Sequence, residues 1–183
     1  MKRALPSVIA IMGRAGSGKT TIAKHLELNH GYVRASFAEI LKDMLQKLGL
    51  SREEIYGSLK EEPCSLLLGK TPRQAMQTLG TEWGRDLIHQ DLWANAWKVR
   101  TAGLLALGHK VVCDDCRYEN EVKFIRTFHG AKIWKAERLE KDLSDLPTHF
   151  SEKDFESIQP DRVFLNFSTV EELKGHIDYA LEN

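Results

Sequence analysis

The chain has 183 residues, 42% of them hydrophobic and 28% charged, a composition typical of an ordinary globular domain. Its 26 basic and 26 acidic side chains balance, which argues against a protein whose main task is to grip long nucleic acid. We expect no stable nucleic-acid binding, no membrane-spanning helix and no secretory signal. The three cysteines do not form a disulfide framework, so a cytoplasmic protein is expected.

Short apolar stretches alternate with amphipathic ones along the chain. Strands are expected at 8–12, 32–37, 110–114, 131–136 and 163–167, and helices at 19–29, 38–48, 91–107 and 119–128. Residues 51–70 suggest short helical pieces and a loop, and residues 137–160 are charged and irregular. Capping boxes at 71–74 and 169–172 predict the beginnings of two more helices, and Gly80 could end the first of them. This alternation predicts an α/β fold with a mainly parallel sheet.

A glycine-rich stretch, GRAGSGKT at 13–20, follows the first expected strand and opens the first expected helix. It fits the pattern G-x-x-x-x-G-K-[ST] completely. Glycines let backbone N–H groups turn toward phosphates, and the helix N-terminus adds positive potential. Lys19 is placed to reach the β- and γ-phosphates, and the Thr20 hydroxyl is placed to bind magnesium. The predicted nucleotide-binding residues are Gly13, Arg14, Ala15, Gly16, Ser17, Gly18, Lys19, Thr20 and Thr21.

The phosphate loop alone does not name a reaction. Guanine-specific switches usually carry an N-K-x-D motif, which this sequence lacks, and a large ATP-driven motor needs a longer chain. A small P-loop kinase with a separate pocket for a phosphate acceptor fits the length best.

Two carboxylates, Asp114 and Asp115, end the expected strand at 110–114. P-loop enzymes hold Mg²⁺ with an acid at such a strand end, directly or through water. Which of the two serves the metal is open, and both could instead be structural. Arg117 could bind a phosphate through its guanidinium, or pair with Glu119 or Glu121.

Cys113 and Cys116 form a C-x-x-C pair. A second pair of ligands is missing, and Cys113 lies within the apolar strand. We therefore expect no redox or zinc role for this pair.

The segment after Thr71 has a polar and an apolar face when plotted at about 100° per residue. Gln74, Thr78, Thr81 and Arg85 fall on one side, opposite Met76, Leu79 and Trp83. The polar side could bind a ligand, although periodicity alone favours a solvated surface. Arg73 and Arg85 are candidates for gripping a monophosphate, because arginine matches phosphate oxygens in a fork.

Several segments together resemble the bacteriophage-type deoxynucleoside monophosphate kinases of the P-loop nucleoside monophosphate kinase superfamily. Besides the phosphate loop, they are SFA at 36–38 with Lys42, TPRQ at 71–74, QTLGTEWGR at 77–85, DCRYENE at 115–121, ER at 137–138, HFSE at 149–152 and 161–166. They span almost the whole chain in the expected order. The middle segments are fairly specific, and the lid segment is the loosest match.

The resemblance implies ATP-dependent phosphorylation of a deoxynucleoside monophosphate, with ATP and Mg²⁺ as cofactors. It implies one three-layer α/β/α P-loop kinase domain over 1–183, with an acceptor-binding helical part at about 38–90 and a lid at about 136–158, and it suggests a homodimer. Its catalytic residues would be Lys19, Arg117 and Arg138, and its metal residues Thr20, Asp115 and Asp114. Its acceptor residues would be Phe37, Lys42, Arg73, Gln77, Thr78, Trp83 and Arg85.

Some positions depart from this pattern or allow another interpretation. Asp114 precedes the acid of the D-x-R segment, and Phe150 stands inside the H-x-S-E segment, where His149 and Ser151 need no catalytic role. The charges near Arg138, including Lys135 and Glu137, would equally suit a solvated helix.

Three other functions remain open at this point. The chain could be a P-loop kinase of another small phosphate such as phosphomevalonate, or a nucleotide-binding regulator without an acceptor. Phosphorylation of nucleic-acid 5′-ends is disfavoured by the neutral charge. If the chain is a phage-encoded deoxynucleoside monophosphate kinase, we expect it to work in the host cytoplasm.

Overall fold

The computed structural model describes residues 4–138, 157–166 and 169–182. The chain divides into two compact units, one made of residues 1–36 and 98–183, the other of residues 37–97. None of the helices in the described ranges is both long enough and apolar enough to cross a membrane.

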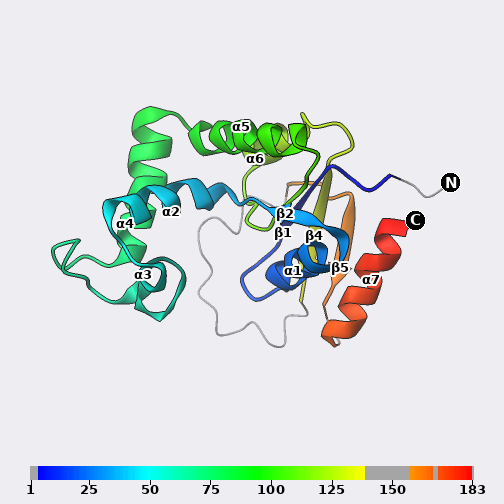
Figure 1. Cartoon of the computed structure of the whole chain (residues 1–183), viewed down its shortest axis with the longest axis horizontal. Coiled ribbons are helices and arrows are strands. Elements are labelled where there is room, and N and C mark those ends of the chain that lie inside the picture. Colours follow the sequence, from blue (N-terminus) through cyan, green and yellow to red (C-terminus); the bar gives the residue numbers. More distant parts are fainter. Residues whose placement is uncertain (1–3, 139–156, 167–168, 183) are drawn as a thin grey trace. The chain divides into compact units, whose positions relative to one another are not determined.

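The first unit is built on a five-stranded sheet (Figure 1). Its strands are β1 (Val8–Met12), β2 (Tyr32–Arg34), β3 (Lys110–Cys113), β4 (Lys132–Glu137) and β5 (Arg162–Leu165), in the order β2-β3-β1-β4-β5. All four neighbouring pairs are parallel, which confirms the predicted α/β fold with a parallel sheet. All five residues of β1 are buried, because this central strand is covered on both faces.

Helices supply the two outer layers of this unit. On one face, α1 (Lys19–His30) and α7 (Val170–Glu182) pack together, and Ile22, Leu26, Leu173 and Ile177 join Ile9 and Ile11 of β1 in one core cluster. Alternate strand residues point the other way, and Val8, Ala10, Val111, Cys113 and Ile133 are buried there. Figure 1 shows α6 (Glu119–Ile125) and the end of α5 (Leu92–Ala106) on that second side.

The second unit is helical. It contains α2 (Phe37–Leu48), α3 (Arg52–Tyr56), a 3₁₀ turn η1 (Ser58–Glu61), α4 (Pro72–Thr78), a π-helical segment η2 (Leu79–Ile88) and the first residues of α5. Its own core consists of Leu41, Leu45, Leu50, Ile55, Met76 and Trp93. The predicted acceptor-binding part at about 38–90 lies inside this unit.

The α4 capping box is present as predicted. The Thr71 hydroxyl accepts a hydrogen bond from the Gln74 backbone N–H at 3.1 Å, and the Gln74 side-chain oxygen accepts one from the Thr71 backbone N–H at 3.0 Å. The amide oxygen of Gln74 therefore caps the beginning of α4. This corrects the placement of Gln74 on a ligand-facing arc. At α7 the Thr169 hydroxyl accepts from the Glu172 backbone N–H at 3.3 Å, which is the first half of the second predicted box.

The prediction that Gly80 could end the helix is wrong. After α4 the chain remains helical, but η2 has π-type hydrogen bonds from residue i+5 to residue i. The wider turn also invalidates the polar arc, which assumed 100° per residue through Arg85. Trp93 contacts this segment, and its indole N–H donates to the Gly80 carbonyl oxygen at 2.7 Å.

Other element boundaries differ from the prediction by a few residues. The strand expected over 110–114 ends at Cys113, the helix expected over 119–128 ends at Ile125, and the strand expected over 163–167 runs from Arg162 to Leu165. The second strand ends at Arg34 and the next helix begins at Phe37, so the predicted strand over 32–37 is too long. Lys135 and Glu137 lie on β4 and form an ion pair at 2.5 Å, so a charged helix is wrong for these two. Most of the expected lid, including His149 and Ser151, lies outside the described residues.

Candidate nucleotide-binding site

The phosphate loop leaves the carboxyl end of β1 and enters α1 at Lys19. Gly13, Gly16 and Gly18 have φ values of 143°, 74° and 105°, a region that side-chain-bearing residues rarely adopt. A Cβ on Gly13 would overlap the carbonyl oxygen of Ala136, and one on Gly18 would lie 2.7 Å from the Asn166 amide nitrogen. The glycines of the motif are therefore required by the backbone path and by close neighbours from β4 and beyond β5.

The Lys19 ammonium folds back over the loop. Its Nζ donates to the carbonyl oxygens of Gly13 and Arg14, each at 2.7 Å. Ser17 is almost fully buried, and its hydroxyl has no hydrogen-bond partner among the described residues. A buried orphan hydroxyl beside an ammonium and a helix N-terminus suits an anion such as a phosphate.

Asp114 follows β3 and lies at the centre of a polar network. The register pairs Cys113 with Ala10 of β1, so Asp114 comes beside the phosphate loop. Its carboxylate, 5% exposed as a residue, accepts from Arg34 Nε at 2.9 Å, from Ser36 Oγ at 3.0 Å and from Thr20 Oγ1 at 3.4 Å. Arg34 Nη2 makes a further ion-pair contact with it.

Magnesium suits this part of the site. Mg²⁺ prefers hard oxygen ligands, and the Thr20 hydroxyl and the Asp114 carboxylate offer two of them 3.4 Å apart. Burial by itself lowers the pKa of the Arg34 guanidinium, but the hydrogen bond and charge of Asp114 outweigh it, so the pKa is raised. Arg34 thus stays charged beside the carboxylate.

Asp115 and the two nearby cysteines form a separate group. Asp115 is half-buried and accepts a hydrogen bond from the Cys113 thiol at 3.2 Å. Burial, and then the nearby negative charge, raise the pKa values of the Cys113 and Cys116 thiols well above the ordinary range. Both thiols are therefore protonated at neutral pH, as a structural role requires.

The two remaining catalytic candidates of this unit are exposed. Arg117 contributes its backbone N–H to the Glu121 carboxylate at 2.7 Å, and Tyr118 does the same at 3.2 Å. Glu121 therefore caps α6, and it contacts Arg117 through the Arg117 backbone. Arg138 directly follows β4, at the edge of the described residues.

The predicted acceptor residues all lie in the second unit, where several already have partners. Phe37 is 3% exposed and packs on Trp97 with ring centroids 4.7 Å apart, so it belongs to the interior of its unit. Lys42 lies over the Tyr56 ring at 4.7 Å. Arg73 forms an ion pair with Glu61.

The other acceptor candidates lie on α4 and η2. Gln77 and Thr78 are exposed, Arg85 is half-buried, and Trp83 packs at 6.1 Å from Trp93 while remaining 39% exposed. Gly84, which lies between Trp83 and Arg85 in the sequence, is buried. A Cβ on Gly84 would overlap the Trp93 indole. This contact explains why a glycine stands in the middle of the helical segment.

Sequence reasoning missed three residues that shape the phosphate-loop region. Arg34 and Ser36 contact Asp114, and the Asn166 amide donates to the Ser17 carbonyl at 3.2 Å. A usable signal existed for Arg34, since it lies in the strand expected at 32–37, and the expected parallel sheet also contains the strand that precedes Asp114. Asn166 lies in the strand expected at 163–167 and in the segment at 161–166 that resembles the family, but neither pattern gives its side chain a role.

Two solved kinase structures have the same fold as this chain. The chain matches the APS kinase of Mycobacterium tuberculosis bound to AMPPNP and APS with a TM-score of 0.56, at 13% identity, covering 99% of this chain and 100% of the other. It matches the dephospho-CoA kinase of Campylobacter jejuni with a TM-score of 0.55, at 12% identity over 97% and 96%. The fold is therefore that of the P-loop kinases.

Sequence comparison narrows this class to a family. The deoxynucleotide monophosphate kinase family model matches residues 69–177. A protein of Acanthamoeba polyphaga mimivirus that carries the name of a deoxynucleotide monophosphate kinase is 34% identical over 189 residues, covering 96% of both chains. A cytidylate kinase of Methanocella arvoryzae is 36% identical over 67 residues, covering 37% of this chain and 38% of the other. The chain belongs to the deoxynucleotide monophosphate kinase family and is a nucleotide kinase, as the resemblance implied.

Proposed function

We propose that this enzyme transfers the γ-phosphoryl group of ATP to the phosphate of a deoxynucleoside monophosphate, giving ADP and the deoxynucleoside diphosphate. The observation that carries the proposal is a complete phosphate loop with Thr20 beside Asp114, 3.4 Å apart, in a member of this family. The acceptor phosphate is an anion near neutral pH, so the transfer needs no strong general base. Positioning and charge stabilisation would supply the rate.

In this proposal the residues of the phosphate loop bind and orient the donor. The Lys19 ammonium exchanges the carbonyls of Gly13 and Arg14 for phosphate oxygens, and the Ser17 hydroxyl gains the partner that it lacks. Thr20 and Asp114 would hold Mg²⁺, which neutralises phosphate charge when bound. Arg34 fixes the orientation of the Asp114 carboxylate.

Arginines outside the phosphate loop would bind the transferred phosphoryl group or the acceptor phosphate. Arg117 and Arg138 are exposed in the first unit and are the candidates for stabilising charge on the transferred group. In the second unit, Arg73 and Arg85 are the candidates for the acceptor phosphate. Arg73 would have to leave Glu61, an exchange of one exposed ion pair for another, which costs little.

A product-resolved assay tests the proposal. Purified enzyme is incubated with Mg·ATP and each of the deoxynucleoside and ribonucleoside monophosphates in turn, with phosphomevalonate as the comparison acceptor. A diphosphate product from one or more deoxynucleotides is expected. If ATP binds but every acceptor remains unphosphorylated, the kinase proposal fails and a nucleotide-binding regulator replaces it; a product from phosphomevalonate alone would indicate the other small-phosphate kinase.

The variant Lys19→Ala tests whether turnover depends on the phosphate loop. Removing the ammonium should lower kcat by at least about 100-fold, because one charge at the transferred phosphoryl group is lost. Lys24→Ala is the matched control, since Lys24 is an exposed lysine of the same helix. Initial rates of both variants give the answer, and near-normal turnover in folded Lys19→Ala protein would contradict the assignment.

A further inference from the structure

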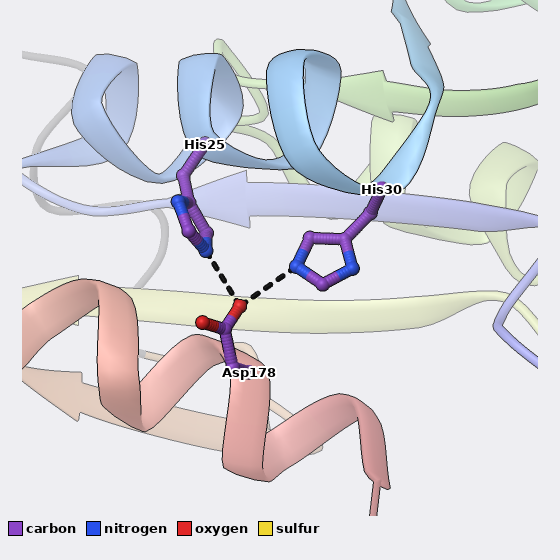
Figure 2. A group of neighbouring side chains, drawn as sticks. All are labelled: His25, His30 and Asp178. Atoms are coloured by element: carbon purple, nitrogen blue, oxygen red, sulfur yellow. Dashed lines mark hydrogen bonds and ion pairs between the residues drawn. The ribbon is translucent and has the colours of Figure 1, made fainter.

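Two histidines and an aspartate converge on the face where α1 meets α7, away from the phosphate loop. His25 and His30 come from α1 and Asp178 from α7, and all three side chains point toward one another (Figure 2). Asp178 Oδ1 lies 2.6 Å from His25 Nε2 and 2.7 Å from His30 Nε2. Their potential ligand atoms all lie within 4.8 Å of one another.

The packing of the two helices sets this convergence. Ile22 and Leu26 of α1, and Leu173 and Ile177 of α7, are buried in one core cluster. His30 is the last residue of α1, and Asp178 directly follows Ile177. The side chains of His25, His30 and Asp178 are 6%, 20% and 46% exposed, so the group is anchored on one side and open to solvent on the other.

The donor set is that of a transition-metal site. Two imidazole nitrogens and one carboxylate oxygen are ligands that Zn²⁺ accepts, with a water in the fourth position. Mg²⁺ is a poor match, because it prefers oxygen ligands throughout. Tetrahedral zinc places its ligand atoms roughly 3.3 Å apart, so the Asp178 oxygen would have to move away from the imidazoles by roughly 0.7 Å. The partial exposure of Asp178 allows that adjustment.

A neighbouring residue lies where a metal-bound histidine needs a partner. The Asn29 amide nitrogen lies 3.1 Å from His25 Nδ1 and 3.2 Å from the His25 carbonyl oxygen. Metal binding at Nε2 would place the proton on Nδ1, which then needs an acceptor. Asn29 is exposed and can present its amide oxygen by turning about its last torsion angle.

We propose that His25, His30 and Asp178 bind one divalent transition-metal ion of the zinc type, which fastens the far end of α1 to α7. His30 stands ten residues beyond Thr20, roughly 15 Å along the helix axis, so this ion would be separate from the catalytic magnesium. The Asn166 amide bonds the phosphate loop at Ser17 from the segment that precedes α7. The ion would thus stabilise the packing of the helix that carries the phosphate loop.

Metal binding is measured on tag-free, chelator-treated full-length enzyme, with Mg²⁺ in excess to occupy oxygen sites. Calorimetry should give one Zn²⁺ per chain, and Co²⁺ in its place should show the visible absorption of a four-coordinate site without a thiolate band. Saturating Zn²⁺ should raise Tm, by roughly 5 to 10 °C at a hundredfold excess over Kd. These readouts do not depend on kinase activity.

Two variants and a matched control decide the assignment. Asp178→Asn and His30→Ala should each lose the bound ion and the Tm shift. His176→Ala should keep both, because His176 is an exposed histidine of α7 outside the cluster. The unfolding curve of each variant without metal shows that it is folded. The proposal is overturned if the parent binds no Zn²⁺, if Co²⁺ shows thiolate ligation, or if the folded Asp178 and His30 variants bind as well as the control.

Discussion

Asp114 is the residue on which the polar contacts of the first unit converge. It accepts hydrogen bonds from Thr20, Arg34 and Ser36, whereas Asp115 accepts one from the Cys113 thiol. In the proposed mechanism, this makes Asp114 rather than Asp115 the acid beside magnesium. Both carboxylates directly follow the same strand, so the sequence could not distinguish them.

Neutral variants separate the two acids. Asp114→Asn should lower kcat by about 100-fold or more and raise the Mg²⁺ concentration needed for half-maximal rate, because a charged oxygen ligand is lost. Asp115→Asn should change both by less than about tenfold. Rates measured against Mg²⁺ concentration test this, with Tm as the check on folding. A larger loss in Asp115→Asn would assign the metal to that residue instead.

The three cysteines should differ in reactivity. The pKa values of Cys113 and Cys116 are raised, first by burial, so their reactive thiolates form only above the pH at which an ordinary thiol ionises. At pH 8, alkylation of the native enzyme should label the partly exposed Cys64 first and leave the other two protected. Mass spectrometry locates the label, and denatured protein should react at all three. Equal labelling of Cys116 and Cys64 in the native state would contradict this expectation.

At the scale of elements, α4 and η2 show how one close contact changes a helix. The Thr71 capping box and Pro72 begin the helix as the sequence predicted. Beyond Thr78 the hydrogen bonding becomes π-type, while Trp93 lies against Gly84 and bonds Gly80. This tertiary contact, rather than local propensity, explains why a glycine stands at position 84 inside the helical path.

Gly84→Ala should therefore destabilise the enzyme. The added methyl group would overlap the Trp93 indole, and overpacking of this kind typically costs about 1–3 kcal/mol. Gly103→Ala is the control, because that glycine lies in α5 with nothing within 4 Å of its missing Cβ, and it should gain about 0.5–1 kcal/mol. Urea unfolding gives both values. A Gly84→Ala protein as stable as the parent would show that Trp93 moves aside freely.

At the scale of the whole molecule, the proposed donor and acceptor residues belong to different compact units. The phosphate loop lies in the unit made of residues 1–36 and 98–183, and the acceptor candidates lie within residues 37–97. Each unit has a buried cluster of its own. We therefore expect ATP and the deoxynucleoside monophosphate to protect backbone amides in different units.

Amide hydrogen exchange tests whether the two substrates bind to different units. A non-hydrolysable ATP analogue with Mg²⁺ should slow amide exchange in peptides covering 13–30, because backbone N–H groups of the loop bind phosphate. A deoxynucleoside monophosphate alone should slow exchange in peptides covering 71–88. Lys19→Ala should lose most of the first effect and keep the second. Protection by the monophosphate only in the first unit would remove the acceptor assignment.

The sequence by itself determined the parts of this protein that depend on neighbouring residues. The phosphate loop, the apolar β1, the Thr71 capping box and the family resemblance all rest on contiguous patterns. The parallel α/β fold followed from their alternation, because period and propensity act over a few residues. The lengths of several elements could not be predicted in this way, because the ends of β2 and α6 depend on packing.

Only the tertiary structure decided which distant residues meet. Arg34 and Asp114 are 80 positions apart, Thr20 and Asp114 are 94 apart, and Ser17 and Asn166 are 149 apart. Their contacts depend on the strand order β2-β3-β1-β4-β5, which sets side by side strands that are not consecutive in the chain. The cluster of His25, His30 and Asp178 has the same origin, because helix packing joins positions 153 and 148 residues apart.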